Sequence, residues 1–168
     1  MPYAEHIDAA RGETARCAVV TLSDTRTEAT DKSGGRIREL LVSQNHTVAH
    51  YTILPDDPAR LEPELSRLRD RDDVDVILTN GGTGVSRRDQ TIAVVERLIE
   101  QPLPGFGELF RMLSWDQIGS GAMLSRAVGG IAHRKLIFAM PGSTPAVELA
   151  MTKLILPELS HLLRELKK

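Results

Sequence analysis

The sequence lacks several features that would assign it to a specialised class of protein. Cys17 is the single cysteine in 168 residues, so a disulfide framework and a cysteine metal site are both excluded. Aromatic residues make up only 4% of the chain, so the core must be aliphatic. The net charge of −2 gives no electrostatic reason to expect nucleic acid or an anionic membrane as a partner.

Long hydrophobic runs are also missing. Residues 1–15 are polar and contain no apolar segment of signal-peptide length. No other run approaches the ~18 apolar residues of a membrane-spanning helix, so a cytoplasmic location follows by default. The length suits one domain with a sizeable core. We therefore expect a polar N-terminal arm over residues 1–15 and a single domain over residues 16–168.

Short apolar runs alternate with segments of helical periodicity. The predicted strands are 16–22, 47–54, 74–80, 128–131 and 135–140. One predicted helix ends near residue 44, and the others cover residues 58–70, 91–100, 106–118 and 146–166. Pro63 is expected only in the first turn of its helix, and Pro157 should kink the last helix. This alternation predicts an α/β fold of three αβα layers, with a mostly parallel central sheet between helices.

Residues 76–91, VILTNGGTGVSRRDQT, are the most informative segment. An apolar strand runs into Asn80 and a GGTG sequence, and a helical pattern begins at Ile92. In an open α/β sheet, ligands bind at such junctions, where glycines let backbone N–H groups approach an anion. Arg87 and Arg88 offer guanidinium groups to phosphate, and Asp89 offers a hard oxygen to Mg²⁺.

This glycine loop matches neither standard phosphate-binding pattern. It lacks the lysine of G-x-x-x-x-G-K-[ST], and its spacing does not fit G-x-G-x-x-G. A plain glycine turn followed by solvated charges, with Asp89 as a helix N-cap, explains the same residues. The loop alone leaves the anion-binding and the turn interpretations equally open.

Polar residues follow four of the predicted strands. They are Ser23-Asp24, Asp56-Asp57, the segment 81–89, and Pro141-Gly142-Ser143. In a parallel sheet these ends share one edge, so Asp24, Asp56 and Asp89 could converge on the glycine loop. One or two carboxylates beside bound phosphate are what a Mg²⁺-nucleotide site requires.

Simpler roles compete at several of these positions. Aspartate favours turns by itself, and Asp57 before Pro58 resembles a helix start, so capping is favoured for Asp57 and left open for Asp56. Ser125-Arg126 reads slightly better as a solvated helix end. The histidines show no spacing suited to a metal: His6, His46, His50, His133 and His161. No G-x-S-x-G elbow is present, which leaves nucleophilic catalysis little support.

Six segments together resemble the molybdenum cofactor biosynthesis proteins of the MogA/MoaB type, to which the gephyrin G domain is also related. They are TLSDT (21–25), LPDD (54–57), LTNGGTGVSRRDQT (78–91), PGFGELFRMLS (104–114), AMLSRAVGG (122–130) and AMPGSTPAVELA (139–150). The resemblance covers residues 16–166, and FRMLS with AMPGST is closest to the MoaB branch. It implies the molybdopterin-binding fold and a homo-oligomer, trimeric or hexameric.

The resemblance also implies a nucleotidyltransferase. Molybdopterin and ATP would be the substrates, Mg²⁺ the cofactor, and adenylyl-molybdopterin and pyrophosphate the products. Asp56 and Asp89 match the family residues that serve Mg²⁺ and catalysis, and Thr83, Ser114 and Ser125 match its molybdopterin phosphate pocket. The other candidate binding residues, from the glycine loop and the neighbouring turns, are Ser23, Asp24, Gly81, Gly82, Gly84, Arg88, Pro141, Gly142 and Ser143.

Two alternatives accompany this hypothesis. Many adenylyltransferases of the family carry Asn two residues before the P-G turn, whereas this chain has Ala139. A molybdopterin-binding carrier or scaffold with little activity is therefore the first alternative, although Asp56 and Asp89 favour an enzyme. A CinA-type nucleotide enzyme is the second, and we expect it to need a partner domain that 168 residues do not accommodate. Other molybdenum cofactor biosynthesis proteins are possible partners.

Overall fold

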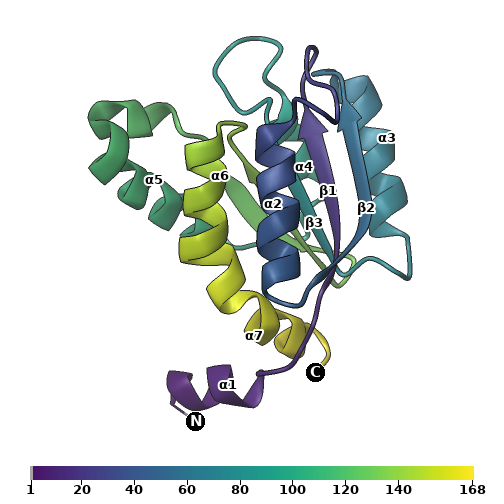
Figure 1. Cartoon of the computed structure of the whole chain (residues 1–168), viewed down its shortest axis with the longest axis vertical. Helices are drawn as coiled ribbons and strands as arrows, with labels where there is room; N and C mark the ends of the chain where they lie inside the picture. The colour runs from purple at the N-terminus through teal and green to yellow at the C-terminus, as the bar shows by residue number, and fades with distance from the viewer. Residues whose placement is uncertain (1) are drawn as a thin grey trace.

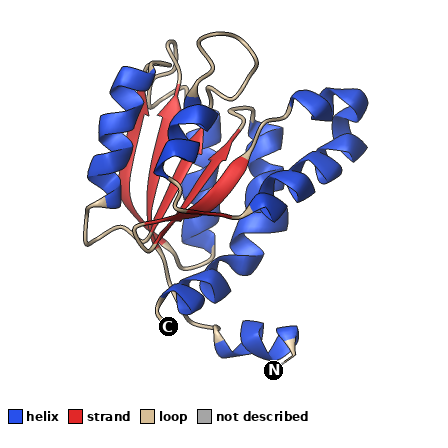
Figure 2. Ribbon diagram, turned by 180° about the vertical axis from the view of Figure 1, so that it is seen from behind, coloured by secondary structure: helices blue, strands red, loops and turns tan. Residues whose placement is uncertain are grey.

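A computed structural model describes residues 2–168, and one six-stranded sheet forms its centre (Figures 1 and 2). The strand order is β2-β1-β3-β6-β5-β4. The strands are β1 (Arg16–Leu22), β2 (Thr47–Leu54), β3 (Val76–Asn80), β4 (Gln101–Pro102), β5 (Val128–Ala132) and β6 (Lys135–Met140). Strands β2, β1, β3 and β6 run parallel, while β5 and β4 are antiparallel to their neighbours. The predicted α/β class is confirmed; the short edge strand β4 was not predicted.

Helices cover both faces of the sheet (Figure 1). They are α1 (Tyr3–Ala9), α2 (Lys32–Ser43), α3 (Pro58–Arg69), α4 (Thr91–Leu98), α5 (Pro104–Ile118), η1 (Gly119–Leu124), α6 (Thr144–Ala150), η2 (Met151–Ile155) and α7 (Leu156–Leu166). Helices α2, α5, α6 and α7 share one hydrophobic core with the sheet, and α3 and α4 share the other. The three predicted layers follow from this division.

Alternation along the central strands builds these two cores. In β1, Cys17 and Val19 face the α2 side, while Ala18 and Val20 face the α3 side. All four side chains are fully buried. Central parallel strands are covered on both faces, which explains why they appear in the sequence as continuous apolar runs.

The two helical prolines have different outcomes. Pro157 was predicted to kink the last helix, and the structure has a wide π-turn, η2, before Pro157, which is the second residue of α7. A widened turn accommodates the proline ring and its missing donor. Pro63 lies inside α3, beyond its first turn, so that expectation was wrong. Pro63 is exposed, which lets water reach the carbonyl that loses its partner.

Helix α5 differs from prediction on its outer side. Of the predicted apolar face, Phe106 and Phe110 are buried and Leu113 packs against the core. Leu109 is 45% exposed and does not belong to that face. Figures 1 and 2 show α5 and η1 projecting at one side of the sheet.

The N-terminal segment contains a helix that the sequence did not predict. Helix α1 lies beside α7, so both chain ends lie at the end of the molecule opposite the glycine loop (Figure 1). None of the helices within residues 2–168 combines the length and the apolarity that crossing a membrane requires.

A glycine in β5 tests the packing of the sheet edge. A Cβ at Gly130 would lie 2.6 Å from Ile99 Cγ2 and 2.8 Å from the Gln101 carbonyl oxygen. We expect Gly130→Ala to lower the free energy of unfolding by ~1–3 kcal/mol, because backbone must move to admit the methyl group. Gly105→Ala is the control, since its Cβ meets nothing within 4 Å and alanine favours a helix. Urea unfolding measures both, and equal stabilities would contradict the expectation.

Candidate functional site

The glycine loop lies between the ends of two strands that flank β3. Gly81 and Gly82 have positive φ values of 97° and 64°, which favour glycine. A Cβ on Gly81 would lie 2.3 Å from the Leu22 carbonyl oxygen, and one on Gly142 would lie 3.0 Å from Gly81 Cα. The Gly81 N–H donates to the Met140 carbonyl at 3.1 Å. Only bare backbone fits between the ends of β1 and β6.

Two carboxylates from different turns lie against this loop. A Cβ on Gly82 would lie 2.5 Å from Asp56 Oδ1, and a Cβ on Gly84 would lie 2.7 Å from Asp89 Oδ2. Burial, followed by the charges of Asp89 and Asp24, raises the pKa of Asp56. The negative groups are therefore close enough to repel one another. Hard carboxylate oxygens gathered beside bare amides fit a Mg²⁺ ion that also contacts phosphate.

Asp24 holds two loops together rather than offering free ligand atoms. Its Oδ1 accepts a hydrogen bond from the Asp56 backbone N–H at 3.0 Å. Its Oδ2 lies 2.7 Å from a guanidinium nitrogen of Arg88. Asp24 thus fixes the turn that carries Asp56, and it holds Arg88 beside the acids. The Arg88 side chain remains 68% exposed, so it is accessible to a ligand.

Of the two aspartates considered as helix N-caps, one caps its helix and the other does not. Asp57 Oδ1 accepts from the Ala59 N–H at 2.9 Å, which confirms Asp57 as the N-cap of α3. Asp89 does not cap α4: the N-cap is Gln90, which makes no side-chain cap bond. Asp89 Oδ2 instead accepts from the Ser86 N–H at 3.0 Å, closing the turn before the helix. The N-cap interpretation of Asp89 was therefore wrong.

The serines in the neighbouring turns shape the backbone. Ser23 Oγ accepts from the backbone N–H groups of Thr25 and Arg26 at 3.2 Å and 3.1 Å. Ser143 Oγ accepts from the Ala146 N–H at 3.3 Å and caps α6. Turn and cap chemistry accounts for both hydroxyls.

The three residues matched to a phosphate pocket come from three elements. Thr83 is buried in the glycine loop, Ser114 is buried in α5, and Ser125 follows η1. Ser114 Oγ donates to the Phe110 carbonyl at 2.7 Å, so it must give up that bond to donate to a phosphate oxygen. No hydrogen bond joins the three side chains to one another within residues 2–168.

Arg126 brings the segment after η1 to the glycine loop. Its guanidinium donates to the Gly84 carbonyl oxygen at 3.1 Å. The side chain is therefore not simply solvated at a helix end, which was the slightly favoured interpretation. Because Ser125 precedes Arg126, this contact also fixes the position of Ser125 relative to the loop.

A buried polar cluster under the loop was missed by the sequence analysis. The Asp31 carboxylate accepts from Thr21 Oγ1 at 2.6 Å, Tyr51 Oη at 2.8 Å and the Gly34 N–H at 3.0 Å. Asn80 Nδ2 donates to Thr21 Oγ1 at 2.9 Å. The D-x-S-G pattern at residues 31–34 was a signal, because Asp31 is the N-cap of α2. The contacts to β1, β2 and β3 left no pattern in the sequence.

Arg26 extends this cluster to the turn after β6. Its guanidinium donates to Ser33 Oγ at 2.5 Å and to the Gly142 carbonyl at 2.8 Å. Ser33 Oγ in turn donates to Asn80 Oδ1 at 2.8 Å. The ends of β1, β3 and β6 are thereby connected through side chains directly beneath the candidate site.

Hydrogen bonding decides the charge of Asp31. Burial alone would raise its pKa, but the bonds from Thr21, Gly34 and Tyr51 and the charge of Arg26 lower the pKa below its ordinary value. Burial, followed by the hydrogen bond to Asp31, raises the pKa of Tyr51 to about 12. An ionised Asp31 and a neutral Tyr51 are therefore the stable pair at neutral pH.

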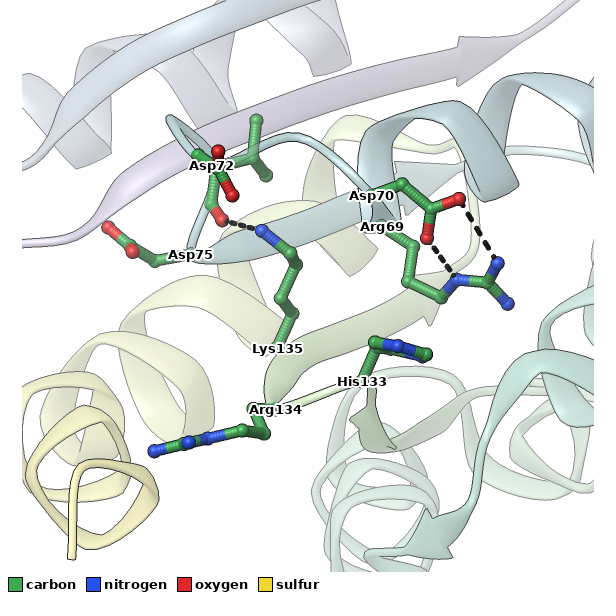
Figure 3. Close-up of a pocket in the computed structure, with 8 residues that line it drawn as sticks. Arg69, Asp70, Asp72, Asp75, His133, Arg134 and Lys135 are labelled. Carbon is green, nitrogen blue, oxygen red and sulfur yellow. Dashed lines mark hydrogen bonds and ion pairs between the residues drawn. The ribbon is translucent and has the colours of Figure 1, made fainter.

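A polar cavity of about 470 Å³ lies at the opposite edge of the sheet (Figure 3). Several of its charged groups already have partners: Arg69 Nε donates to Asp70 at 2.9 Å, and Lys135 Nζ donates to the Val74 carbonyl at 2.5 Å. Asp75 accepts from Arg16. Because these contacts occupy four of the charged groups that line it, the cavity is a weaker candidate than the glycine loop.

Comparison with known proteins gives consistent matches. The probable molybdopterin binding domain family matches residues 18–161. A molybdenum cofactor biosynthesis protein B from Bacillus anthracis is 53% identical over 100% of this chain and 99% of its own. A protein of the same name from Staphylococcus aureus strain Mu50 is 47% identical over 98% and 99%.

Solved structures agree with these relatives. A crystal structure of molybdenum cofactor biosynthesis protein B superposes with a TM-score of 0.90 and 54% identity, covering 92% of this chain and 96% of that one. The tungsten cofactor synthesizing protein MoaB from Pyrococcus furiosus gives 0.82 and 33%, covering 93% and 99%.

Asp31→Asn tests the buried cluster through its pH dependence. At pH 7 the variant should lose about 2–3 kcal/mol of unfolding free energy, since an amide cannot replace an ionised acceptor of several hydrogen bonds. The folded pKa of Asp31 is depressed, so its contribution is present above the unfolded pKa and is lost as pH falls below about 4. Urea unfolding from pH 7 to pH 3 should therefore show the two proteins converging. The exposed Asp72→Asn is the control, and a pH-independent gap would contradict this assignment.

Proposed function

Because this chain belongs to the molybdopterin binding domain family, we propose that it acts in molybdenum cofactor biosynthesis as a molybdopterin adenylyltransferase. The substrates would be molybdopterin and ATP, with Mg²⁺ as cofactor. The placement of Asp56 and Asp89 against the glycine loop is the observation that supports catalysis. A protein that only carried molybdopterin would have no need for two such acids beside an anion-binding backbone.

The reaction we propose is an adenylyl transfer. A terminal phosphate oxygen of molybdopterin forms a bond to the α-phosphorus of ATP. The bond between that phosphorus and the oxygen bridging to the β-phosphate breaks, and pyrophosphate leaves with the electron pair. The attacking group is already an anion, so the protein has no proton to remove from it. Positioning and charge relief are then the main demands on the site.

This chain has groups that could position the phosphates and neutralise their charge. Asp56 and Asp89 would hold a Mg²⁺ ion, which when bound neutralises charge on the nucleotide phosphates. The Gly81 N–H already donates to the Met140 carbonyl, so the bare backbone of Gly82 would bring the N–H groups that follow to the phosphate oxygens. The guanidinium of Arg88, held by Asp24 and exposed, can neutralise further negative charge.

Molybdopterin would bind on the side of the loop formed by α5 and η1. Thr83 and Ser125 offer hydroxyl groups there, and Arg126 keeps Ser125 beside the loop. Ser114 can join them if its hydroxyl turns away from Phe110. Hydroxyl and amide donors hold a phosphate without the strong ion pair that would reduce its reactivity.

A pterin carrier with little catalysis is the second candidate, and Ala139 is the observation in its favour. Ala139 is fully buried in β6 and pairs in register with Thr79 of β3. Thr79 Oγ1 is buried and has no hydrogen-bond partner within residues 2–168. A polar side chain at position 139 could supply that partner. Because Ala139 offers no hydrogen bond, the end of β3 is less constrained in this chain.

Neighbouring aspartates provide a matched test of the catalytic proposal. With molybdopterin, Mg²⁺ and labelled ATP, Asp56→Asn should release pyrophosphate at least ~100-fold more slowly than the unmodified protein. Asp57→Asn should keep nearly full turnover and nearly unchanged stability, because Asp57 only caps α3 and asparagine is an equally good N-cap. Equal turnover in the two variants would remove Asp56 from the mechanism, and tight molybdopterin binding without turnover in the unmodified protein would favour the carrier.

The same Asp56 variant has a predicted effect on stability. Since folding raises the pKa of Asp56, the folded state favours the neutral form, and the ionised group costs stability above its unfolded pKa. Asp56→Asn should therefore be as stable as the unmodified protein at pH 7, or more stable, in urea unfolding. A large loss of stability would mean that reduced turnover reflects misfolding.

We also propose self-association through the outer face of α5 and η1. Exposed apolar side chains gather there: Leu109, Met112, Trp115, Ile118, Met123 and Leu124. Light scattering should give the mass of a trimer or hexamer, and Met123→Glu should lower it, because a charge would be buried in the interface. Met123 is 78% exposed, so the monomer fold should tolerate the change. Val42→Glu on α2, at 62% exposure, is the control and should leave the mass unchanged.

A further inference from the structure

We propose that His6, His161 and Glu165 form a binding site for a transition metal ion of the Zn²⁺ class. Within residues 2–168 they are the one group of three histidine, cysteine or acidic side chains whose ligand atoms all lie within 4.8 Å of one another. Along the sequence these histidines show no metal spacing, because His6 and His161 come from opposite ends of the chain. The fold brings them together where α1 meets α7 (Figure 1).

The distances are close to those a tetrahedral ion needs. His161 and Glu165 are one turn apart on α7, with His161 Nε2 3.8 Å from Glu165 Oε1. His6 Nδ1, from α1, lies 4.0 Å from the same oxygen. Ligand atoms around tetrahedral Zn²⁺ are about 3.3 Å apart, given bonds of ~2.0–2.1 Å. Small rotations of partly exposed side chains can close this difference.

A second carboxylate already orients one of the ligands. His161 Nδ1 lies 3.3 Å from Glu158 Oε2, which leaves Nε2 directed toward Glu165. A carboxylate that holds the far nitrogen of a histidine is a regular feature of metal sites. Tyr3 donates to the other oxygen of Glu158, and its ring packs edge-on to His161 with centroids 6.0 Å apart. The surroundings thus favour one orientation of the imidazole.

Helix α1 is a segment that such an ion would stabilise. It has seven residues, and none of them is buried. Isolated helices of this length are unstable in water. The segment that follows α1 is held separately, by the Glu13–Lys167 ion pair and by a hydrogen bond from Ser160 Oγ of α7 to the Glu13 carbonyl at 2.8 Å. A metal bound by residues of both helices would fasten α1 to the domain.

The donor set selects the class of ion. Two imidazoles and one carboxylate suit Zn²⁺, Ni²⁺ or Cu²⁺, whereas Mg²⁺ prefers oxygen ligands. Lys168 Nζ, 2.6 Å from Glu165 Oε1, is a competing cation. The site lies at the opposite end of the molecule from the glycine loop, so its role is structural and independent of the proposed transfer reaction (Figure 1).

Titration of the untagged full-length chain with ZnCl₂ after EDTA treatment tests the site. Calorimetry should show one equivalent bound, and a saturating excess should raise Tm by about 5 °C. His6→Ala and Glu165→Gln should each weaken binding at least tenfold, and Glu158→Gln by ~10–100-fold. His133→Ala is the matched control, because His133 lies on an exposed turn near Glu100 and belongs to no such group of three metal-binding side chains within residues 2–168. Binding that is absent, or that is equal in the His6 and His133 variants, would overturn the proposal.

Lys168→Ala separates a metal site from a cluster of ion pairs. Removing the competing ammonium should tighten Zn²⁺ binding several-fold, while a cluster that only forms ion pairs would become less stable and gain no affinity. Unchanged or weaker Zn²⁺ affinity in this variant would therefore count against the site. The Mg²⁺-dependent release of pyrophosphate should be the same in the His6→Ala variant and the unmodified chain, so failure of either proposal can be recognised without reference to the other.

Discussion

The close approach of bare backbone at Gly81 is the constraint on which the candidate site depends. The carbonyl of Leu22 and the turn at Gly142 both come so near that a methyl group on either glycine would collide with backbone. This contact joins the ends of β1, β3 and β6 without side chains between them. It leaves the loop after β3 without side chains at Gly81 and Gly82, and it sets how far the acids on neighbouring turns lie from that loop. A site for phosphate and a cation can form only where these ends are held this closely.

Close backbone packing alone would not fix the positions of the turns that follow each strand. The hydrogen bonds of the Asp31 cluster fix them. Its carboxylate receives bonds from β1 and β2, while Arg26 reaches the Gly142 carbonyl. A buried charge is costly unless every partner is present, so the cluster tolerates few arrangements. That intolerance keeps the turns beneath the candidate site in one arrangement, because alternative positions of the turns would break several hydrogen bonds at once. Asp24 does the same on the exposed side, where it links the Asp56 backbone to Arg88.

The fold was largely predictable because its signals are local. The bounds of β2 and the capping of α3 by Asp57 both follow from short patterns, alternation in one case and an Asp-Pro start in the other. Parallel strands then bring their carboxyl ends together by geometry alone, which is why Asp56 and Asp89 could be associated before any coordinates. Leu109 and Pro63 show where local reasoning fails. Helical spacing does not show which apolar side chains, such as Leu109, remain exposed to solvent. An exposed position in a helix tolerates a proline such as Pro63, which a buried position would exclude.

The features that could not be predicted depend on contacts between distant segments. Asp31 could be recognised as a helix cap, but its bonds to Thr21 and Tyr51 exist only once three strands are assembled. His6 and His161 are similar: each is an isolated histidine in the sequence, and their proximity follows from where α1 packs. Ser114 is the opposite case, since the family resemblance assigns it a ligand while the helix occupies its hydroxyl locally. A hydroxyl assigned to a ligand from sequence therefore still has to be checked against the backbone carbonyl one turn before it.

Asp56 shows how the fold tolerates a group whose ionised form opposes folding. Burial and the neighbouring charges of Asp89 and Asp24 raise the pKa of Asp56, so its ionised form opposes folding. Nothing in local turn chemistry requires that arrangement, because Asp57 alone caps the helix that follows. The two hydrophobic cores stabilise the fold despite the free-energy cost of an ionised Asp56. A bound divalent cation would make the ionised Asp56 stabilising, because the carboxylates would then coordinate the cation instead of repelling one another. An acid such as Asp56, which destabilises the protein alone but would stabilise it with a cation, is better explained by binding than by folding, which is the physical reason for proposing it as a ligand rather than as part of the scaffold.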